Sequence, residues 1–272
     1  MGEFHRGDAL IHYTDTGLPE GRPDAATVFF GHGLLFSGWM FGPQIADLGA
    51  DYRCVTIDWR GQGGSAACSR GYDMDTLAAD AIALIDLLGV APVHYVGLSM
   101  GGFVGQRIAA RHPGLVRSLT LLDTSAGPED PANARRYKRL AAAYRLTGIA
   151  PLRKSVLPLM FGPAFLSDPA NTALQDEWER RLGHCRRSGI SRAARGVAGR
   201  ASVESEVGSI TAPTLVVVGA DDAATPPAES RRIGELIPGS RVELVPDCGH
   251  TSTLEQPAAI TRLIRDFLGT LG

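Results

Sequence analysis

The chain has 272 residues, of which 44% are hydrophobic and 21% are charged, and its formal net charge at pH 7 is -2. A chain of this length can bury roughly three quarters of its unfolded surface, so we expect one domain that carries an insertion. The nearly balanced charge excludes a polyanion-binding surface as the main function, and we expect no nucleic-acid partner.

The four cysteines are widely spaced, and the chain has neither a C-x-x-C motif nor a histidine pair at zinc-binding spacing. They are Cys54, Cys68, Cys185 and Cys248. We therefore expect free thiols in a reducing compartment, with no metal and no cofactor. Residues 1–10 lack the apolar core of a secretory signal, and no apolar run reaches about 18 residues. These features predict a soluble cytoplasmic protein that does not contact a membrane.

Short apolar runs predict the first strands. They lie at residues 9–13, 27–30 and 52–57. A helix is expected at residues 39–48, and a longer helix follows, with Asp75 as its expected N-cap and Gly89 at its end. This longer helix has one apolar face, which carries Leu77, Ala81, Leu84, Ile85 and Leu88.

The same alternation continues in the second half of the chain. Further strands are predicted at residues 93–96, 115–122, 214–218 and 241–245. Residues 102–112 are predicted to form a helix that ends before Pro113. A last helix carries apolar residues at helical spacing, namely Ile260, Leu263, Ile264, Phe267 and Leu268. Strands that alternate with amphipathic helices predict an α/β fold with a mostly parallel sheet covered on both faces.

The strand pattern is interrupted between residues 126 and 208, where proline, arginine and helical stretches dominate. This interruption predicts a helical cap inserted into the α/β core. The expected division is a core formed by residues 1–125 and 209–272, and a cap formed by residues 126–208.

A serine stands between two glycines after the predicted strand at residues 93–96, in the pentapeptide Gly97-Leu98-Ser99-Met100-Gly101. A sharp strand-to-helix turn holds such a serine in a strained backbone conformation, with no room for side chains two residues before and after it. The turn would expose the Ser99 hydroxyl and leave the Met100 amide free to face developing negative charge. A tight turn whose serine caps the helix is the alternative.

Candidate partners for this serine follow two later strands. Asp222 comes after the strand at residues 214–218, and His250 comes after the strand at residues 241–245, with no other histidine beyond it. Because the loops that follow parallel strands open at the same edge of a sheet, Ser99, Asp222 and His250 can meet there. Other acids near this edge stay open as partners, namely Asp123, Asp221 and Asp247.

Five sequence signatures together resemble the α/β-hydrolase superfamily over nearly the whole chain. They are His32-Gly33, residues 58–65, the serine pentapeptide, residues 219–227, and Gly249-His250 with residues 255–257. Within the superfamily, the chain resembles the carboxylesterase and 3-oxoadipate enol-lactonase branch, in which the acid lies in a G-x-x-D-x-x-T-P-P stretch. That pattern selects Asp222, three residues after Gly219, over Asp221.

The resemblance implies acyl transfer by a catalytic triad of Ser99, Asp222 and His250. A serine hydroxyl is a weak nucleophile at neutral pH, so His250 would accept its proton during attack and return it to the leaving alcohol. Asp222 would orient the imidazole and stabilise its protonated form. By resemblance, the backbone amides of Met100 and Leu34 would form the oxyanion hole.

Large apolar residues are expected to form the substrate pocket, and they come from both the core and the predicted cap. They are Phe36, Trp39, Trp59, Met160, Phe161, Phe165 and Trp178. A pocket of this kind favours small, largely apolar esters. His32 is expected to support the loop behind the oxyanion hole rather than to carry a proton.

The sequence thus predicts a carboxylic ester hydrolase with a small-molecule substrate, and several activities compete with it. A lactonase for enol-lactones or acyl-homoserine lactones would use the same machinery with a different pocket shape. A cofactor-free haloperoxidase would also use the triad, but Leu34 stands where such enzymes commonly have tryptophan. Ser99 excludes a dehalogenase or epoxide hydrolase, which would need an aspartate nucleophile. A non-catalytic ligand receptor is disfavoured because such proteins often lose the triad.

Overall fold

The computed structural model describes residues 1–271 and contains one eight-stranded sheet with the strand order β1-β2-β4-β3-β5-β6-β7-β8. The strands are β1 (Gly2–Arg6), β2 (Ala9–Asp15), β3 (Thr27–Gly31), β4 (Arg53–Ile57), β5 (Val93–Leu98), β6 (Val116–Leu122), β7 (Thr214–Gly219) and β8 (Arg241–Val245). Strands β1 and β2 pair antiparallel with each other, and β2 pairs antiparallel with β4. All other neighbours are parallel, which confirms the predicted α/β fold.

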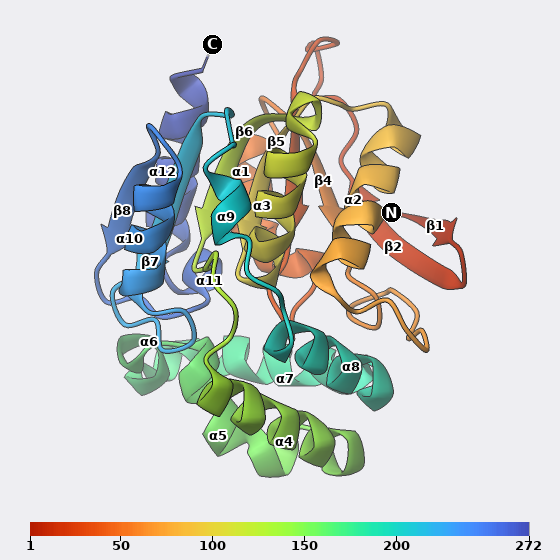
Figure 1. Cartoon of the computed structure of the whole chain (residues 1–272), viewed down its shortest axis with the longest axis vertical. Helices are drawn as coiled ribbons and strands as arrows, with labels where there is room; N and C mark the ends of the chain where they lie inside the picture. Colours follow the sequence, from red (N-terminus) through yellow and green to blue (C-terminus); the bar gives the residue numbers. More distant parts are fainter. Residues whose placement is uncertain (272) are drawn as a thin grey trace.

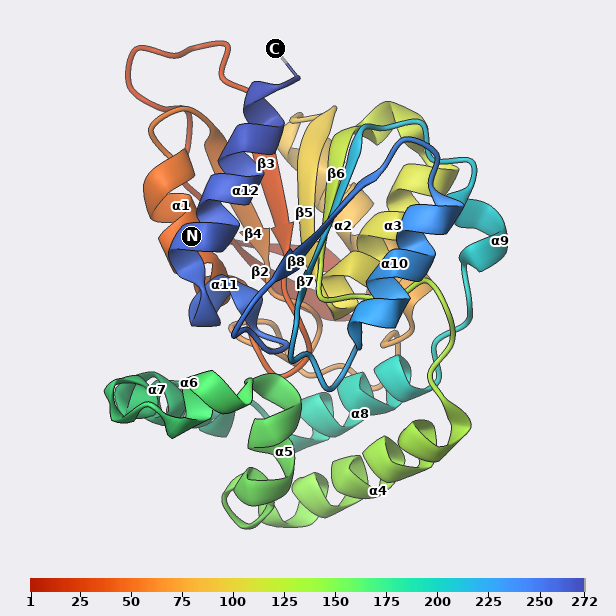
Figure 2. The same cartoon turned by 90° about the vertical axis from the view of Figure 1, so that its left-hand side faces the viewer.

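Helices cover both faces of the sheet (Figure 1, Figure 2). One face carries α2 (Met74–Leu88), α3 (Met100–Arg111) and α10 (Pro227–Leu236), and the other carries α1 (Gly42–Leu48), the short α11 (Ser252–Glu255) and α12 (Pro257–Gly269). In β3, Phe29 packs in the first apolar layer, whereas Val28 and Phe30 pack in the second. Successive side chains of a strand point to opposite faces, so a strand buried on both sides is apolar throughout.

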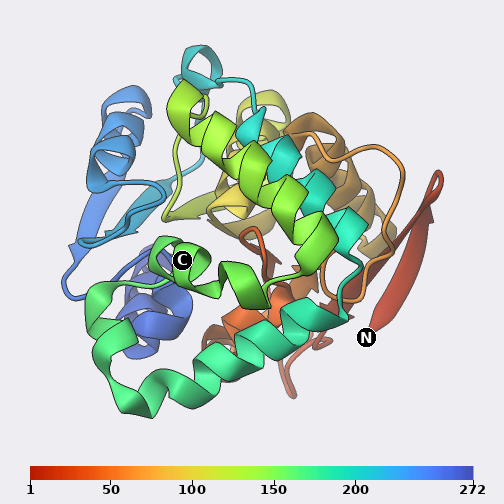
Figure 3. The same cartoon turned by 90° about the horizontal axis from the view of Figure 1, so that it is seen from below.

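The chain between β6 and β7 contains no strand, and five of its helices form a group that we call the inserted helices. They are α4 (Pro131–Thr147), α5 (Arg153–Met160), α6 (Pro163–Ser167), α7 (Thr172–His184) and α8 (Arg187–Ala198). They lie below the sheet in Figure 1, and the view from below shows α4 beside α8 across the end of the core (Figure 3). Short 3-10 helices occur at Gly38–Phe41, Pro113–Leu115, Ala150–Leu152 and Pro169–Asn171.

One end of the predicted cap segment packs elsewhere. The short helix α9 (Glu204–Val207) contacts α3 and α10 on a face of the sheet rather than the inserted helices. The exact division of the chain at residue 208 stays a prediction. Within residues 1–271, every helix is too short or too polar to span a bilayer.

Near the start of the chain, one predicted helix cap is wrong and one strand is missing from the prediction. The N-cap of α2 is Asp73, whose side chain accepts a hydrogen bond from the Thr76 amide at 2.8 Å, and not Asp75. Asp75 instead forms ion pairs with Arg107 and Arg111 of α3. Strand β1 was not predicted, because an edge strand that is mostly exposed lacks a continuous apolar pattern.

Candidate active site

Ser99 occupies a strained turn between β5 and α3. Its backbone angles are φ 51° and ψ -110°, outside the conformations that residues with side chains ordinarily adopt. A Cβ atom on Gly97 would lie 2.5 Å from the carbonyl of Gly101, and one on Gly101 would collide with the carbonyl oxygen of Gly31 in β3. The two glycines are therefore required because the turn packs directly against backbone. This geometry is that of the sharp strand-to-helix turn predicted from the sequence, which we call the elbow.

Asp222 follows β7 and His250 follows β8, and the two side chains meet. The Nδ1 atom of His250 lies 2.9 Å and 3.0 Å from the two carboxylate oxygens of Asp222. Asp222 also accepts hydrogen bonds from the amides of Ala224 and Thr225 and from the Thr225 hydroxyl, so its position is set on several sides. The carboxylate is thus able to orient the imidazole.

The protonation of His250 depends on two opposing effects. Burial lowers the pKa of His250, but the charge of Asp222, the hydrogen bond to it and the nearby charges of Asp123 and Glu255 together raise the pKa by more. The result is a pKa above the ordinary value of 6.5. The pair therefore stabilises an imidazolium, which is the form that appears when histidine accepts a proton.

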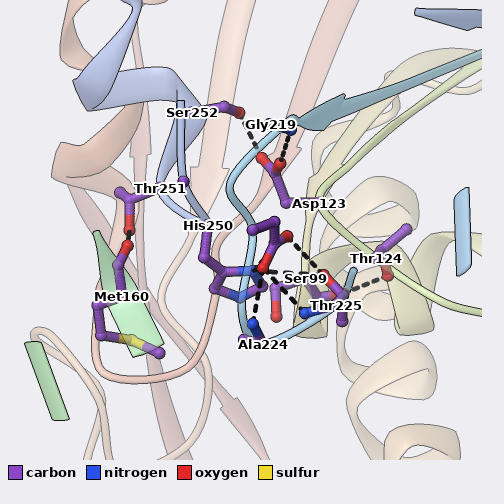
Figure 4. Close-up of polar contacts among 12 residues, drawn as sticks. Ser99, Asp123, Thr124, Met160, Gly219, Ala224, Thr225, His250, Thr251 and Ser252 are labelled. Carbon is purple, nitrogen blue, oxygen red and sulfur yellow. Dashed lines mark hydrogen bonds and ion pairs between the residues drawn. The ribbon is translucent and has the colours of Figure 1, made fainter. Parts of the chain in front are cut away.

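Ser99 and His250 line the same cavity, and Figure 4 shows the Ser99 side chain beside the imidazole. Within residues 1–271, the Ser99 hydroxyl makes no hydrogen bond. Its backbone, by contrast, is bound on both sides, since the Ser99 amide donates to Leu122 and the Ser99 carbonyl accepts from the Thr124 hydroxyl at 2.8 Å each. The backbone of the turn is held while the hydroxyl is left uncommitted.

The expected oxyanion donors lie in two turns at this edge of the sheet. Met100 is the first residue of α3, so its amide has no acceptor within the helix. The Leu34 amide donates no hydrogen bond within the described residues. Its neighbour Leu35, at φ 69°, is held in place because its amide donates to the Gln62 side chain at 2.9 Å and its carbonyl accepts from the Trp178 indole at 3.2 Å.

His32 lies behind this turn and is fully buried. The Trp59 amide donates to His32 Nε2 at 2.9 Å, so the ring proton is on Nδ1, which donates to the Gly33 carbonyl at 2.7 Å. Burial lowers the pKa of His32 to about 4. His32 is therefore neutral, and both of its ring nitrogens make hydrogen bonds to the protein, which agrees with the supporting role expected for it.

The other candidate acids do not contact His250. Asp221 and Asp247 are exposed, whereas Asp123 is fully buried and accepts hydrogen bonds from the Gly219 amide at 2.9 Å and from the Ser252 hydroxyl. Burial and then the charge of Asp222 raise the pKa of Asp123 well above its usual range. Asp123 thus joins the loops that carry Asp222 and His250 without touching the imidazole.

The cavity beside Ser99 has a volume of about 100 Å³ and is bounded mostly by residues of the chain between β6 and β7. Of the seven residues expected to form the pocket, only Met160 lines it. The other apolar wall residues are Leu34, Leu35, Phe103, Leu140, Ala141, Ile149, Leu152, Val156, Leu159, Ile190, Ala194, Val197 and Ala224. Polar wall residues besides Ser99, Thr225 and His250 are Glu129, Tyr137, Tyr144 and Arg200.

The structure places the other six expected pocket residues outside the lining of this cavity. Phe36 and Trp39 line a separate cavity, and Trp59 donates from its indole to the His32 carbonyl. The remaining three are Phe161, Phe165 and Trp178. They are buried and form an aromatic cluster, in which Phe161 contacts both of the others and Phe36 packs against Phe161 and Trp178. Large aromatic side chains gain most from complete burial, so they fill the core of the insertion rather than its open wall. The smaller wall residues recur at helical spacing in α4 and α8, which was the available sequence signal.

A half-buried carboxylate connects the inserted helices to the histidine loop. Glu255 accepts hydrogen bonds from the amides of Gly249 and Thr251, on either side of His250, and from the amide of Gly162 between α5 and α6. The Thr251 hydroxyl also donates to the carbonyl of Met160, at the end of α5. The loop that carries His250 is therefore bonded directly to the insertion.

Comparison with known proteins agrees with this geometry. A family model for the alpha/beta hydrolase fold matches residues 26–257. A relative from Variovorax paradoxus (strain S110), for which the proposed name is carbamate hydrolase RutD, is 30% identical over 262 residues that cover 95% of this chain and 96% of the relative.

Two solved structures are similar over almost the whole chain. The enol-lactonase from Burkholderia xenovorans LB400 is 27% identical, with a TM-score of 0.90 over 98% of this chain and 100% of that one. A thermophilic esterase from Thermogutta terrifontis with bound malate is 27% identical, with a TM-score of 0.87 over 97% of this chain and 94% of that one. The chain therefore belongs to the α/β-hydrolase fold family.

Proposed function

We propose that this protein hydrolyses small, uncharged carboxylic esters through an acyl-enzyme intermediate on Ser99. The observation that carries the proposal is the strained Ser99 turn opening into the same cavity as the His250 ring, whose far side is bonded to Asp222. A hydroxyl on a strained turn, open to a cavity and beside an oriented imidazole, is the arrangement that acyl transfer needs.

In the first half of the reaction, Ser99 Oγ attacks the acyl carbon while His250 Nε2 takes the hydroxyl proton. The amides of Met100 and Leu34 donate to the oxyanion of the tetrahedral intermediate, and His250 then returns the proton to the leaving alcohol. In the second half, water attacks the acyl carbon with His250 as base, and the acid leaves as Ser99 regains its proton. Serine–histidine hydrogen bonds are often long in unliganded sites and shorten when substrate binds.

The inserted helices support a cap role in this proposal. Cavity residues from α4, α5 and α8 form most of the wall opposite Ser99. We propose that residues 126–208 act as the cap, with α9 as the point where the chain returns to the core. The apolar wall favours an apolar acyl or alcohol group.

A lactonase is the second candidate, supported by the similarity to the Burkholderia enol-lactonase. A lactone is a cyclic ester, so the same attack opens the ring and leaves the alcohol attached to the acyl group. A panel of aliphatic esters, lactones and carbamates, compared by kcat/KM, distinguishes these substrates.

The direct test is Ser99→Ala, assayed with p-nitrophenyl butyrate. We expect hydrolysis to fall on the order of a thousandfold or more while the circular dichroism spectrum is unchanged. Ser209→Ala, at an exposed position outside the cavity, is the matched control. A fluorophosphonate should add mass to the wild-type protein at Ser99 alone, and undiminished turnover by Ser99→Ala would refute the assignment.

A further inference from the structure

An ion pair lies in the wall of the Ser99 cavity. The Arg200 guanidinium and the Glu129 carboxylate are 2.7 Å apart, and their side chains are only 5% and 8% exposed. Among the residues that line this cavity, they are the only carboxylate and the only guanidinium. The charge that a substrate meets beyond the triad therefore depends on this pair.

The guanidinium of Arg200 is already occupied by the protein. Besides Glu129, it donates to the carbonyls of Gly127 and Val197 and to the hydroxyl of Ser125, at 3.1 to 3.3 Å. Its central carbon lies 4.3 Å from the centre of the Phe103 ring. Arg200 is thus held in one position with its charge compensated. Its guanidinium is not free to bind an anion through two parallel hydrogen bonds.

Beyond the oxyanion site and the imidazole beside Ser99, the rest of the cavity offers no cation to an anionic acyl chain either. The wall is apolar apart from the triad region, the ion pair and two tyrosines. Burial raises the pKa of Tyr137 to about 12, so its hydroxyl keeps its proton, and this hydroxyl makes no hydrogen bond within residues 1–271. Tyr137 can therefore offer a neutral hydrogen bond to a substrate oxygen.

We propose that Glu129, by neutralising Arg200, makes the cavity selective for uncharged acyl chains and against acyl chains that end in a carboxylate. A carboxylate brought into this space would lose its water without gaining a free cation. It would also approach the negative charge of Glu129. This proposal rests on the proposed ester hydrolysis and names the substrate class of that site.

The experiment uses two esters that differ by one group. In p-nitrophenyl hexanoate the acyl chain ends in a methyl group, and in mono-p-nitrophenyl adipate a carboxylate replaces that methyl. Rates for Ser99→Ala are subtracted to remove uncatalysed release. We expect kcat/KM for the hexanoate to exceed that for the adipate on the order of a hundredfold.

Three charge variants test the cause of this ratio. Glu129→Gln leaves Arg200 uncompensated and should improve the adipate relative to the hexanoate by about tenfold or more. Arg200→Gln should shift the ratio the other way, and the double variant should return it toward the wild-type value. The matched control is Asp80→Asn, which alters a buried ion pair with Arg60 that does not line the cavity.

A binding measurement separates this proposal from the catalytic one. Isothermal titration of the Ser99→Ala protein compares methyl hexanoate with monomethyl adipate and requires no turnover. We expect only the neutral ester to bind, and Glu129→Gln in the same background to admit the anion. The proposal is overturned if both esters bind equally. It is also overturned if none of the three charge variants changes the hexanoate-to-adipate ratio of kcat/KM. Both outcomes apply whether or not Ser99 proves catalytic. Turnover that persists in the Ser99→Ala protein, together with selective binding of the neutral ester, overturns only the catalytic role.

Discussion

The Glu255 carboxylate accepts a hydrogen bond from the Gly162 amide at 2.8 Å, although the two residues are 93 positions apart. The same oxygen accepts from the Gly249 amide at 2.9 Å, immediately before His250. One carboxylate oxygen thus bonds the segment between α5 and α6 to the histidine loop. The position of the imidazole therefore depends on the insertion as well as on β8.

Glu255→Gln should weaken this connection, because an amide nitrogen cannot accept hydrogen bonds from backbone amides. We expect kcat for p-nitrophenyl butyrate to fall about tenfold through misplacement of His250, with KM changed less. The control is Glu235→Gln, whose side chain is 66% exposed. If kcat stays at the wild-type value in a folded Glu255→Gln protein, the carboxylate has no positioning role.

The activity should depend on pH through His250. Only neutral imidazole can accept the serine proton, so kcat/KM should rise with pH, with its midpoint above 6.5 because Asp222 raises the pKa of His250. Asp222→Asn removes that charge and should lower both the midpoint and kcat, the latter on the order of a thousandfold or more. Steady-state profiles between pH 5 and 9 provide the measurement, and a flat profile with chemistry limiting would contradict the assignment of the base.

Gly101→Ala should destabilise the fold, because the added methyl group would collide with the carbonyl oxygen of Gly31. Overpacking of this kind costs about 3 kcal/mol, which thermal and urea denaturation can measure. Gly183→Ala, at an exposed position of α7 with open space around it, should be neutral or slightly stabilising. Equal stability of the two variants would show that the elbow tolerates side chains.

Stability should fall in acid through His32. The folded protein keeps His32 neutral down to about pH 4, whereas the unfolded chain binds a proton near pH 6.5. The unfolded state therefore binds more protons in this interval, and the free energy of unfolding decreases as pH falls, by about 3 kcal/mol from this group. His32→Gln should reduce the pH slope of stability between pH 4 and 6.5. An unchanged slope would mean that other groups cause it.

Much of the fold could be predicted because it follows from short-range patterns. The strands around Phe29 and Val96 are largely apolar because both faces are covered, and that pattern is visible in the sequence. The N-cap of α2 was predicted wrongly as Asp75 instead of Asp73, because capping depends on the backbone path into the helix. Strand β1 is defined by its pairing with β2, which no local pattern encodes.

The sequence by itself determined the alternation of strands and helices, the glycines that the Ser99 turn requires, and the order of Asp222 and His250 behind their strands. Each of these depends on spacing over a few residues or on which loops share one edge of a parallel sheet. Only the tertiary structure decided which side chains line the cavity, and that Glu129 compensates Arg200 there. These features depend on how the inserted helices pack across the sheet, which brings together residues that are distant in the chain.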